Sequence, residues 1–161
     1  MQSEKIWFDG SQGKLAARLD RPVRRPKGFA LFAHCFTCSK DIFAASRIAQ
    51  GLAELGIATL RFDFTGLGMS EGEFANTNFS SNIDDLLKAA EHMRVHLEAP
   101  KIMVGHSLGG SAVLAAAGQV PEVQAVATIG APFDPAHVGH HFDHKTAEIE
   151  AEGEAEVTLV G

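Results

Sequence analysis

The chain has 161 residues, which fits one domain able to bury a core, and its 45% hydrophobic and 21% charged content is ordinary for a globular protein. Its formal net charge of −6 argues against nucleic acid or an anionic membrane as the main partner. The sequence shows neither an apolar stretch of signal-peptide length at its start nor a run that could span a bilayer, so we expect a cytoplasmic protein without a membrane partner.

The first third of the chain predicts a hairpin, a buried strand and a helix. Residues 5–8 and 14–19 flank the turn sequence Asp9-Gly10-Ser11-Gln12-Gly13, which predicts an antiparallel hairpin. Residues 28–33 are a continuous apolar run, as expected for a strand that is buried on both faces. Apolar residues recur on one helical face over residues 41–55, and Gly56 is placed to end that helix.

The middle of the chain continues this alternation. A strand at 58–62 precedes a glycine-rich loop at 65–78, and Ser81 or Asn82 can cap a helix that runs to about residue 97. The last predicted elements are a strand at 101–104, a helix at 111–119 and a strand at 123–129. This order predicts an α/β fold with three layers (αβα), in which helices cover both faces of a mainly parallel sheet that carries an N-terminal antiparallel hairpin.

The sequence Gly105-His106-Ser107-Leu108-Gly109 stands between a predicted strand and a predicted helix. The pattern G-x-S-x-G in that setting is typical of a nucleophile elbow, where a sharp turn lifts the serine hydroxyl above the carboxyl edge of the sheet. Flanking glycines allow the strand and the helix to approach closely. We therefore predict that Ser107 is a nucleophile; the alternative is a glycine-rich turn with a passive serine.

Three segments resemble the α/β-hydrolase superfamily over roughly residues 14–140. They are His34-Cys35-Phe36, the stretch 61–72 that begins Arg61-Phe62-Asp63, and residues 105–110. More narrowly, residues 34–41 together with 74–82 resemble a bacterial group of serine aminopeptidase-like (S33), dienelactone-hydrolase-related hydrolases, some of which carry a C-terminal OsmC-type domain. The resemblance implies an α/β-hydrolase core that is incomplete at its C-terminal end.

Acyl transfer also requires donors for the developing oxyanion. Leu108, the residue after the nucleophile, offers a backbone N–H at the start of a helix, where the helix dipole favours negative charge. The resemblance implies that the second donor is the backbone N–H of Phe36. Here the chain has His34-Cys35 where the family usually has His-Gly, and we interpret His34 as a structural hydrogen-bonding residue rather than a base.

The acid and the base of a triad follow the serine in chain order. Asp134 is the candidate acid and His137 the candidate base, and the further histidines His140, His141 and His144 lie beyond. We predict a hydrolase core at 1–133, followed by residues 134–161 as a linker or cap-entry segment with a terminal acidic strand at 148–156. The alternative to Asp134 and His137 is that the acid and base lie elsewhere, in a longer hydrolase.

Other chemistries have weaker support, and we predict no cofactor and no metal. The spacing of the four histidines is compatible with zinc or nickel, but no cysteine or acidic ligand accompanies them. The glycines after Asp63 lack the third glycine of a dinucleotide-binding fingerprint. Cys35 and Cys38 form a C-x-x-C motif, so a thiol oxidoreductase is the alternative from another class.

The sequence therefore predicts a serine hydrolase that acts on a small-molecule ester, thioester, lactone or amide through an acyl-enzyme on Ser107. A non-catalytic hydrolase-fold fragment remains the third alternative. An exposed sheet edge could also allow self-association.

Overall fold

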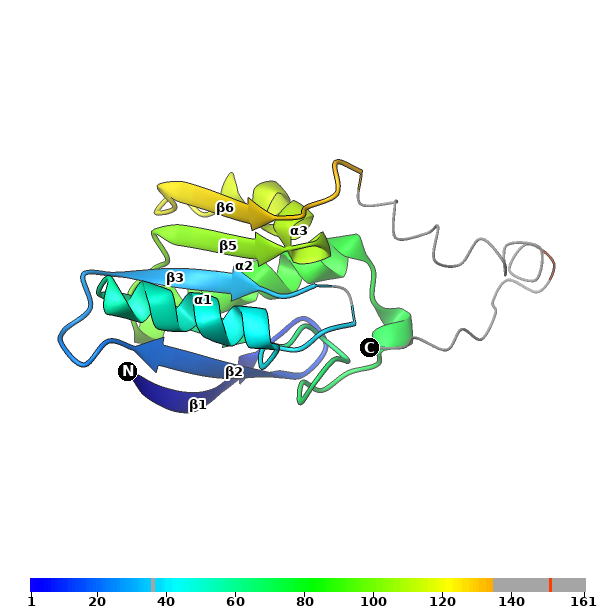
Figure 1. Cartoon of the computed structure of the whole chain (residues 1–161). Coiled ribbons are helices and arrows are strands. Elements are labelled where there is room, and N and C mark those ends of the chain that lie inside the picture. Colours follow the sequence, from blue (N-terminus) through cyan, green and yellow to red (C-terminus); the bar gives the residue numbers. More distant parts are fainter. Residues whose placement is uncertain (36, 135–150, 152–161) are drawn as a thin grey trace.

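A six-stranded sheet organises the part of the chain that the computed structural model describes, namely residues 1–35, 37–134 and 151 (Figure 1). The strands are β1 (Gln2–Asp9), β2 (Lys14–Arg21), β3 (Gly28–Ala33), β4 (Ile57–Phe62), β5 (Ile102–His106) and β6 (Ala125–Ile129). The helices are α1 (Phe43–Glu54), α2 (Phe79–His96) and α3 (Leu108–Ala117), with a short 3-10 helix, η1 (Phe74–Asn76).

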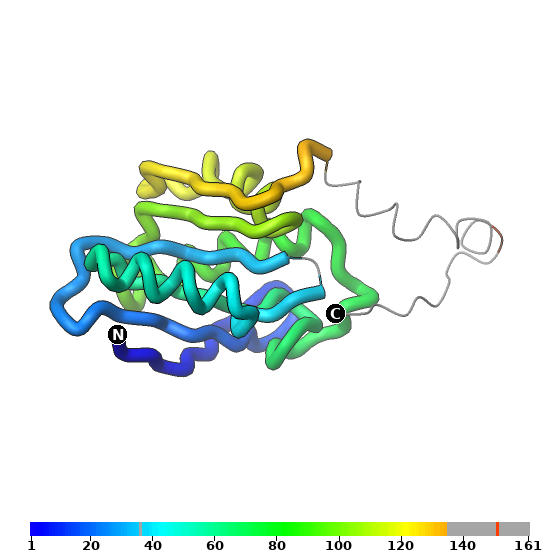
Figure 2. Tube along the Cα trace, in the orientation of Figure 1, coloured from blue at the N-terminus to red at the C-terminus, as the bar shows by residue number. Residues whose placement is uncertain are grey.

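The strand order across the sheet is β1-β2-β4-β3-β5-β6. β1 pairs with β2 as the predicted hairpin, β2 is antiparallel to β4, and the strands from β4 to β6 are parallel. The predicted fold class is thus confirmed. Because β4, β3, β5 and β6 all run in the same direction, their carboxyl ends lie at the same end of the sheet, as the Cα trace shows (Figure 2).

The two faces of the sheet bury separate clusters of apolar side chains. On one face Phe32 and Val104 pack with Ala45 of α1. On the other, Leu31 and Met103 belong to a larger cluster that also contains the buried side chains of α2 and α3. Successive residues of a strand point to opposite faces, so β3, with all six of its residues buried, requires a helix on each side.

The N-cap of α2 lies three residues before Ser81, the first of the two predicted caps. It is Asn78, whose side chain accepts a hydrogen bond from the Ser81 backbone N–H at 2.9 Å, while the Ser81 hydroxyl accepts one from the Asn78 N–H. The prediction that Ser81 or Asn82 is the cap was therefore wrong, because Ser81 is the partner in a reciprocal capping box. The apolar periodicity that located the helix does not itself mark its first residue.

Replacing Asn78 with alanine is expected to lower the free energy of unfolding by about 1 kcal/mol, because one N-terminal N–H group loses its acceptor. Asn82→Ala is the matched control, since the Asn82 side chain does not cap the helix. Urea unfolding of the two variants provides the measurement. Equal destabilisation of both would show that the capping box has no specific role.

β6 pairs with β5 on one side, and within the described residues its other side has no partner strand. Its side chains are mostly exposed, in contrast to those of β3. Of the strand predicted at 148–156 the structure describes only Ala151, which is helical, so that prediction was wrong at this residue. Among the described residues, no helix has the length and apolar character needed to cross a membrane.

Candidate active site

Ser107 is the single residue between the last residue of β5, His106, and the first residue of α3, Leu108. Its backbone angles are φ 53° and ψ −124°, and φ in this region is uncommon for residues other than glycine. The turn is held by two hydrogen bonds: the Ser107 N–H donates to the Ile129 carbonyl at 2.8 Å, and the Gly110 N–H donates to the Ser107 carbonyl at 2.8 Å. The structure thus places Ser107 at the carboxyl edge of the parallel strands, in the geometry of a nucleophile elbow.

Two glycines make this turn sterically possible. A Cβ on Gly105 would overlap the backbone of Gly109 in the first turn of α3. A Cβ on Gly109 would overlap the carbonyl oxygens of Ala33 and His34, which end β3 and begin the following loop. The predicted start of the helix at residue 111 was three residues late, because close packing rather than helix propensity fixes Gly109 in the first helical turn.

The residue predicted to be the first oxyanion donor, Leu108, lies at the N-terminus of α3. Leu108 is the first residue of the helix, and the N–H groups of a first helical turn have no intrahelical acceptor. Its N–H therefore lies next to Ser107 at the positive end of the helix dipole. The second predicted donor, Phe36, lies outside the described residues.

His34 connects the loop after β3 to the loop after β4. The Phe64 N–H donates to His34 Nε2 at 3.2 Å, and His34 Nδ1 lies 2.7 Å from the Cys35 carbonyl oxygen. Because Nε2 accepts a hydrogen bond, the proton of the neutral ring is on Nδ1, which then donates to Cys35. His34 is 1% exposed, and its two bonded nitrogens support the structural role predicted for it rather than that of a base.

Burial is the main cause that lowers the pKa of His34 below the ordinary value near 6.5. The bond to the Cys35 carbonyl and the charge of Asp63 act in the opposite direction, and Lys40 adds to the lowering. Near pH 6.5 the His34 ring binds a proton in the unfolded chain but not in the folded one. The free energy of unfolding is therefore expected to fall as the pH drops below about 6.5. His34→Gln should remove this part of the pH dependence.

Urea unfolding between neutral and mildly acidic pH measures that difference. His92→Gln is the matched control, because burial also lowers the pKa of His92 and the charge of His96 adds to the effect. Each substitution should therefore reduce the dependence of the free energy of unfolding on pH by the contribution of the histidine that it removes. A His34→Gln curve parallel to that of the wild type would contradict the neutral, doubly bonded ring.

A buried ion pair fixes the far end of the loop after β3. Lys40 Nζ donates to Asp63 Oδ2 at 2.7 Å, and the Lys40 N–H donates to Asp63 Oδ1 at 2.6 Å. Asp63 also accepts the Met69 N–H at 2.9 Å, so the carboxylate joins the loops after β3 and β4. Sequence analysis missed this pair; the available signal was that each residue follows a buried strand at the same edge of the sheet.

Cys35 and Cys38 form a disulfide within the loop after β3. Cys35 also lines a small hollow beside the elbow, together with Leu108 and Gly109. The hollow has a volume of about 10 Å³, which is room for roughly one water molecule. This hollow is too small by itself to hold an acyl group.

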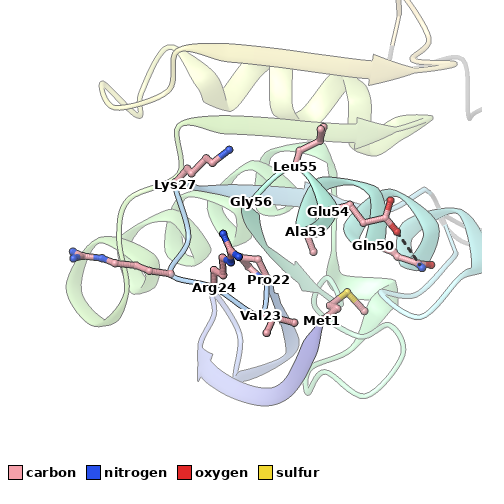
Figure 3. Close-up of a pocket in the computed structure, with 11 residues that line it drawn as sticks. Met1, Pro22, Val23, Arg24, Lys27, Gln50, Ala53, Glu54, Leu55 and Gly56 are labelled. Atoms are coloured by element: carbon pink, nitrogen blue, oxygen red, sulfur yellow. Dashed lines mark hydrogen bonds between the residues drawn. The ribbon is translucent and has the colours of Figure 1, made fainter.

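A larger hollow of about 550 Å³ is lined by other segments of the chain (Figure 3). Pro22, Val23 and Lys27 line it from the connector before β3, and Leu55 and Gly56 line it from the segment before β4. These segments precede β3 and β4, whereas Ser107 follows β5. The hollow therefore lies at the amino ends of the parallel strands, and Ser107 lies at their carboxyl ends. The hollow contains none of the predicted catalytic residues.

Of the predicted acid and base, the structure describes only Asp134, an exposed residue five positions after the end of β6. The segment between β6 and Asp134 is held by the Ser111 hydroxyl, which donates to the Pro132 carbonyl at 2.8 Å. His137, His140, His141 and His144 lie outside the described residues. Within residues 1–35, 37–134 and 151, no three His, Cys, Asp or Glu side chains are grouped in a way that could hold a metal ion.

Comparison with known proteins identifies the family. The family model described as serine aminopeptidase, S33, matches residues 24–151. Palmitoyl-protein thioesterase ABHD10 of Mus musculus, a mitochondrial protein, is 36% identical over 86 residues, which are 53% of this chain and 28% of the relative.

Two examples among the similar solved structures illustrate the shared fold. The esterase domain of a Rhodothermus marinus protein is 51% identical, with a TM-score of 0.71 and coverage of 87% of this chain and 55% of that one. XC6422 of Xanthomonas campestris, described as an α/β serine hydrolase without a lid, is 28% identical, with a TM-score of 0.73 and coverage of 82% and 62%. The chain thus spans little more than half the length of these structures.

Proposed function

The chain belongs to the serine aminopeptidase S33 family of α/β hydrolases, and from this premise we propose that the protein hydrolyses carboxylic esters or thioesters through an acyl-enzyme on Ser107. The observation that carries the proposal is the backbone of Ser107, turned sharply between the carboxyl end of β5 and the N-terminus of α3. Such a turn presents a hydroxyl to a substrate and a free N–H to its carbonyl oxygen.

The reaction begins when Ser107 Oγ attacks the carbonyl carbon of the substrate and gives its proton to a base. Negative charge develops on the carbonyl oxygen, which the Leu108 N–H stabilises, with the Phe36 N–H as the expected second donor. The intermediate collapses, the alcohol or thiol leaves with a proton, and water then releases the acid from the ester on Ser107. Asp134 and His137 remain the proposed acid and base within this chain.

Esters and thioesters are favoured over amides because of the relatives. One solved relative is described as an esterase domain and one curated relative as a palmitoyl-protein thioesterase. Alkoxides and thiolates are also better leaving groups than amines. Collapse of the tetrahedral intermediate therefore demands less of the active site with esters and thioesters than with amides.

The test compares three kinds of substrate with the full-length gene product. These are p-nitrophenyl esters of acetate, butyrate and octanoate, an acyl-thioester of N-acetylcysteamine, and amino-acid p-nitroanilides. We expect turnover of esters and thioesters, with a burst of p-nitrophenol that is stoichiometric with the enzyme. Turnover of the anilides alone, or of none of the three, would contradict the proposal.

The thiol oxidoreductase alternative is less well supported by the geometry. The C-x-x-C motif is not at an independent site but in the loop that lies against the elbow, with Cys35 beside Leu108 and Gly109. A role of the cysteines within the hydrolase accounts for that position better than a separate activity does.

A further inference from the structure

The loop after β3 contains a crosslink that the hydrolase reaction does not use. The disulfide joins Cys35 to Cys38, and Cys35 is the second residue after the end of β3. Cys35 shares a hollow with Leu108, whose N–H is the first oxyanion donor, and with Gly109. The crosslink is therefore close to the residue proposed as the first oxyanion donor.

Three interactions hold the Cys35 end of this loop. Besides the disulfide, the Cys35 carbonyl accepts hydrogen bonds from His34 Nδ1 at 2.7 Å and from the Cys38 N–H at 3.2 Å. Two of the three depend on where Cys38 lies. Loss of the crosslink would leave two hydrogen bonds to that carbonyl, and the one from the Cys38 N–H would no longer be reinforced by the disulfide.

The turn also holds an unfavourable backbone conformation. Thr37 has φ 59°, in the left-handed region that favours glycine, although Thr37 is β-branched. Such a residue keeps this conformation only where its surroundings impose it, and the crosslinked turn does so here. Opening the crosslink gives the turn a lower-energy alternative.

The residues around the turn confine any such change to a short segment. Before it, Ala33 ends β3 as a buried residue of the sheet. After it, Lys40 is fixed by the buried pair with Asp63. Both cysteines are half-buried rather than enclosed, so a small thiolate can reach the disulfide from solvent.

We propose that Cys35 and Cys38 form a redox site that switches the hydrolase, active as the disulfide and impaired as the dithiol. This inference rests on the proposed function, because the loop that it controls is the one expected to carry the second oxyanion donor. The partner is a dithiol reductant of the protein or small-molecule class.

The exchange is a two-electron thiol–disulfide reaction. One thiolate of the reductant attacks a sulfur of the disulfide, the S–S bond breaks, and a mixed disulfide forms. The second thiol of the reductant then attacks the reductant's own sulfur in the mixed disulfide. This closes an intramolecular disulfide in the reductant and releases the protein as a dithiol. The protein gains two electrons and two protons as two thiols, and the reductant loses them.

The test uses the full-length gene product, equilibrated with reduced or oxidised dithiothreitol. Alkylation and mass spectrometry of the peptide that contains Cys35 and Cys38 give the redox state, and p-nitrophenyl butyrate gives kcat and KM. We expect kcat to fall by about tenfold or more on reduction, less than the 10²–10³-fold loss of a whole oxyanion donor, with KM changed little. Oxidised dithiothreitol should restore it.

The Cys35→Ser, Cys38→Ser double variant is the matched control. It should have the low kcat of the reduced wild type and should not respond to dithiothreitol, which separates the crosslink from other effects of the reagent. Equal kcat in the two states of the wild type, with alkylation complete in one and absent in the other, would overturn the switch and leave the hydrolase intact. So would a disulfide that excess dithiothreitol leaves intact in the folded protein.

Amide hydrogen exchange separates the switch from the proposed function. Peptides that cover residues 33–40 should exchange faster in the reduced state, whereas peptides of α2 should not change. If the protein hydrolyses none of the substrates, this measurement still decides: faster exchange in the reduced state supports the redox-controlled loop, and equal exchange overturns it.

Discussion

Replacing Ser107 with alanine is expected to lower kcat for ester hydrolysis by on the order of 10⁴-fold or more, because the reaction would lose its proposed nucleophile. The backbone of the turn should be retained, since alanine adds no atom beyond Cβ and Leu108 keeps its position at the start of α3. The measurement is the steady-state rate with p-nitrophenyl butyrate in the full-length gene product. Ser111→Ala, which removes a serine hydroxyl bonded to the Pro132 carbonyl, is the matched control.

A second substitution at the same position separates chemistry from backbone strain. Ser107→Gly should be as inactive as Ser107→Ala but more stable than it by about 1 kcal/mol, because glycine adopts φ near 53° without a steric penalty. Urea unfolding of the two variants gives the difference. If the glycine variant is the less stable one, the elbow is not strained in solution.

The largest loss of stability is expected from Asp63→Ala, by about 3–5 kcal/mol, because the buried Lys40 ammonium would keep only the partly exposed Asp41 carboxylate, at 3.2 Å, as a charge partner. The Asp63 carboxylate also accepts the backbone N–H groups of Lys40 and Met69, and both would lose their acceptor. Urea or thermal unfolding provides the measurement. Both loops that carry these groups border the elbow, so activity should fall as well.

The control for that variant is an ion pair of similar geometry on the surface. Arg94 donates to both carboxylate oxygens of Glu122, at 2.6 and 2.7 Å, where solvent screens the charges. Glu122→Gln should therefore leave the unfolding transition close to that of the wild type. Equal effects of Asp63→Ala and Glu122→Gln would show that burial of the Lys40 pair adds nothing.

The sheet and the elbow were predictable because their signals are local. The apolar run of β3, the hairpin turn and the alternation of strands with helices each occupy one short segment, and together they determine the layers. Ser107 was recognisable for the same reason, since the glycines that its turn requires stand within two residues of it.

The rest of the site depends on contacts between distant segments. Lys40 and Asp63 are 23 residues apart, and only the parallel pairing of β3 with β4 brings them together. The same is true of the approach of Gly109 to the end of β3, which moved the start of α3 three residues earlier than helix propensity indicates. At α2 the cap was missed because Asn78, Ser81 and Asn82 can all serve as caps, and only the backbone geometry distinguishes them.

The central claim is that the Ser107 hydroxyl is a reactive nucleophile at the carboxyl edge of the sheet. The most direct test is to treat the full-length gene product with a fluorophosphonate and to locate the adduct by tandem mass spectrometry. We expect one adduct, on Ser107, that is absent from the Ser107→Ala variant. An unmodified Ser107 in a protein that still hydrolyses esters, or an adduct on another residue that accounts for the activity, would contradict the claim.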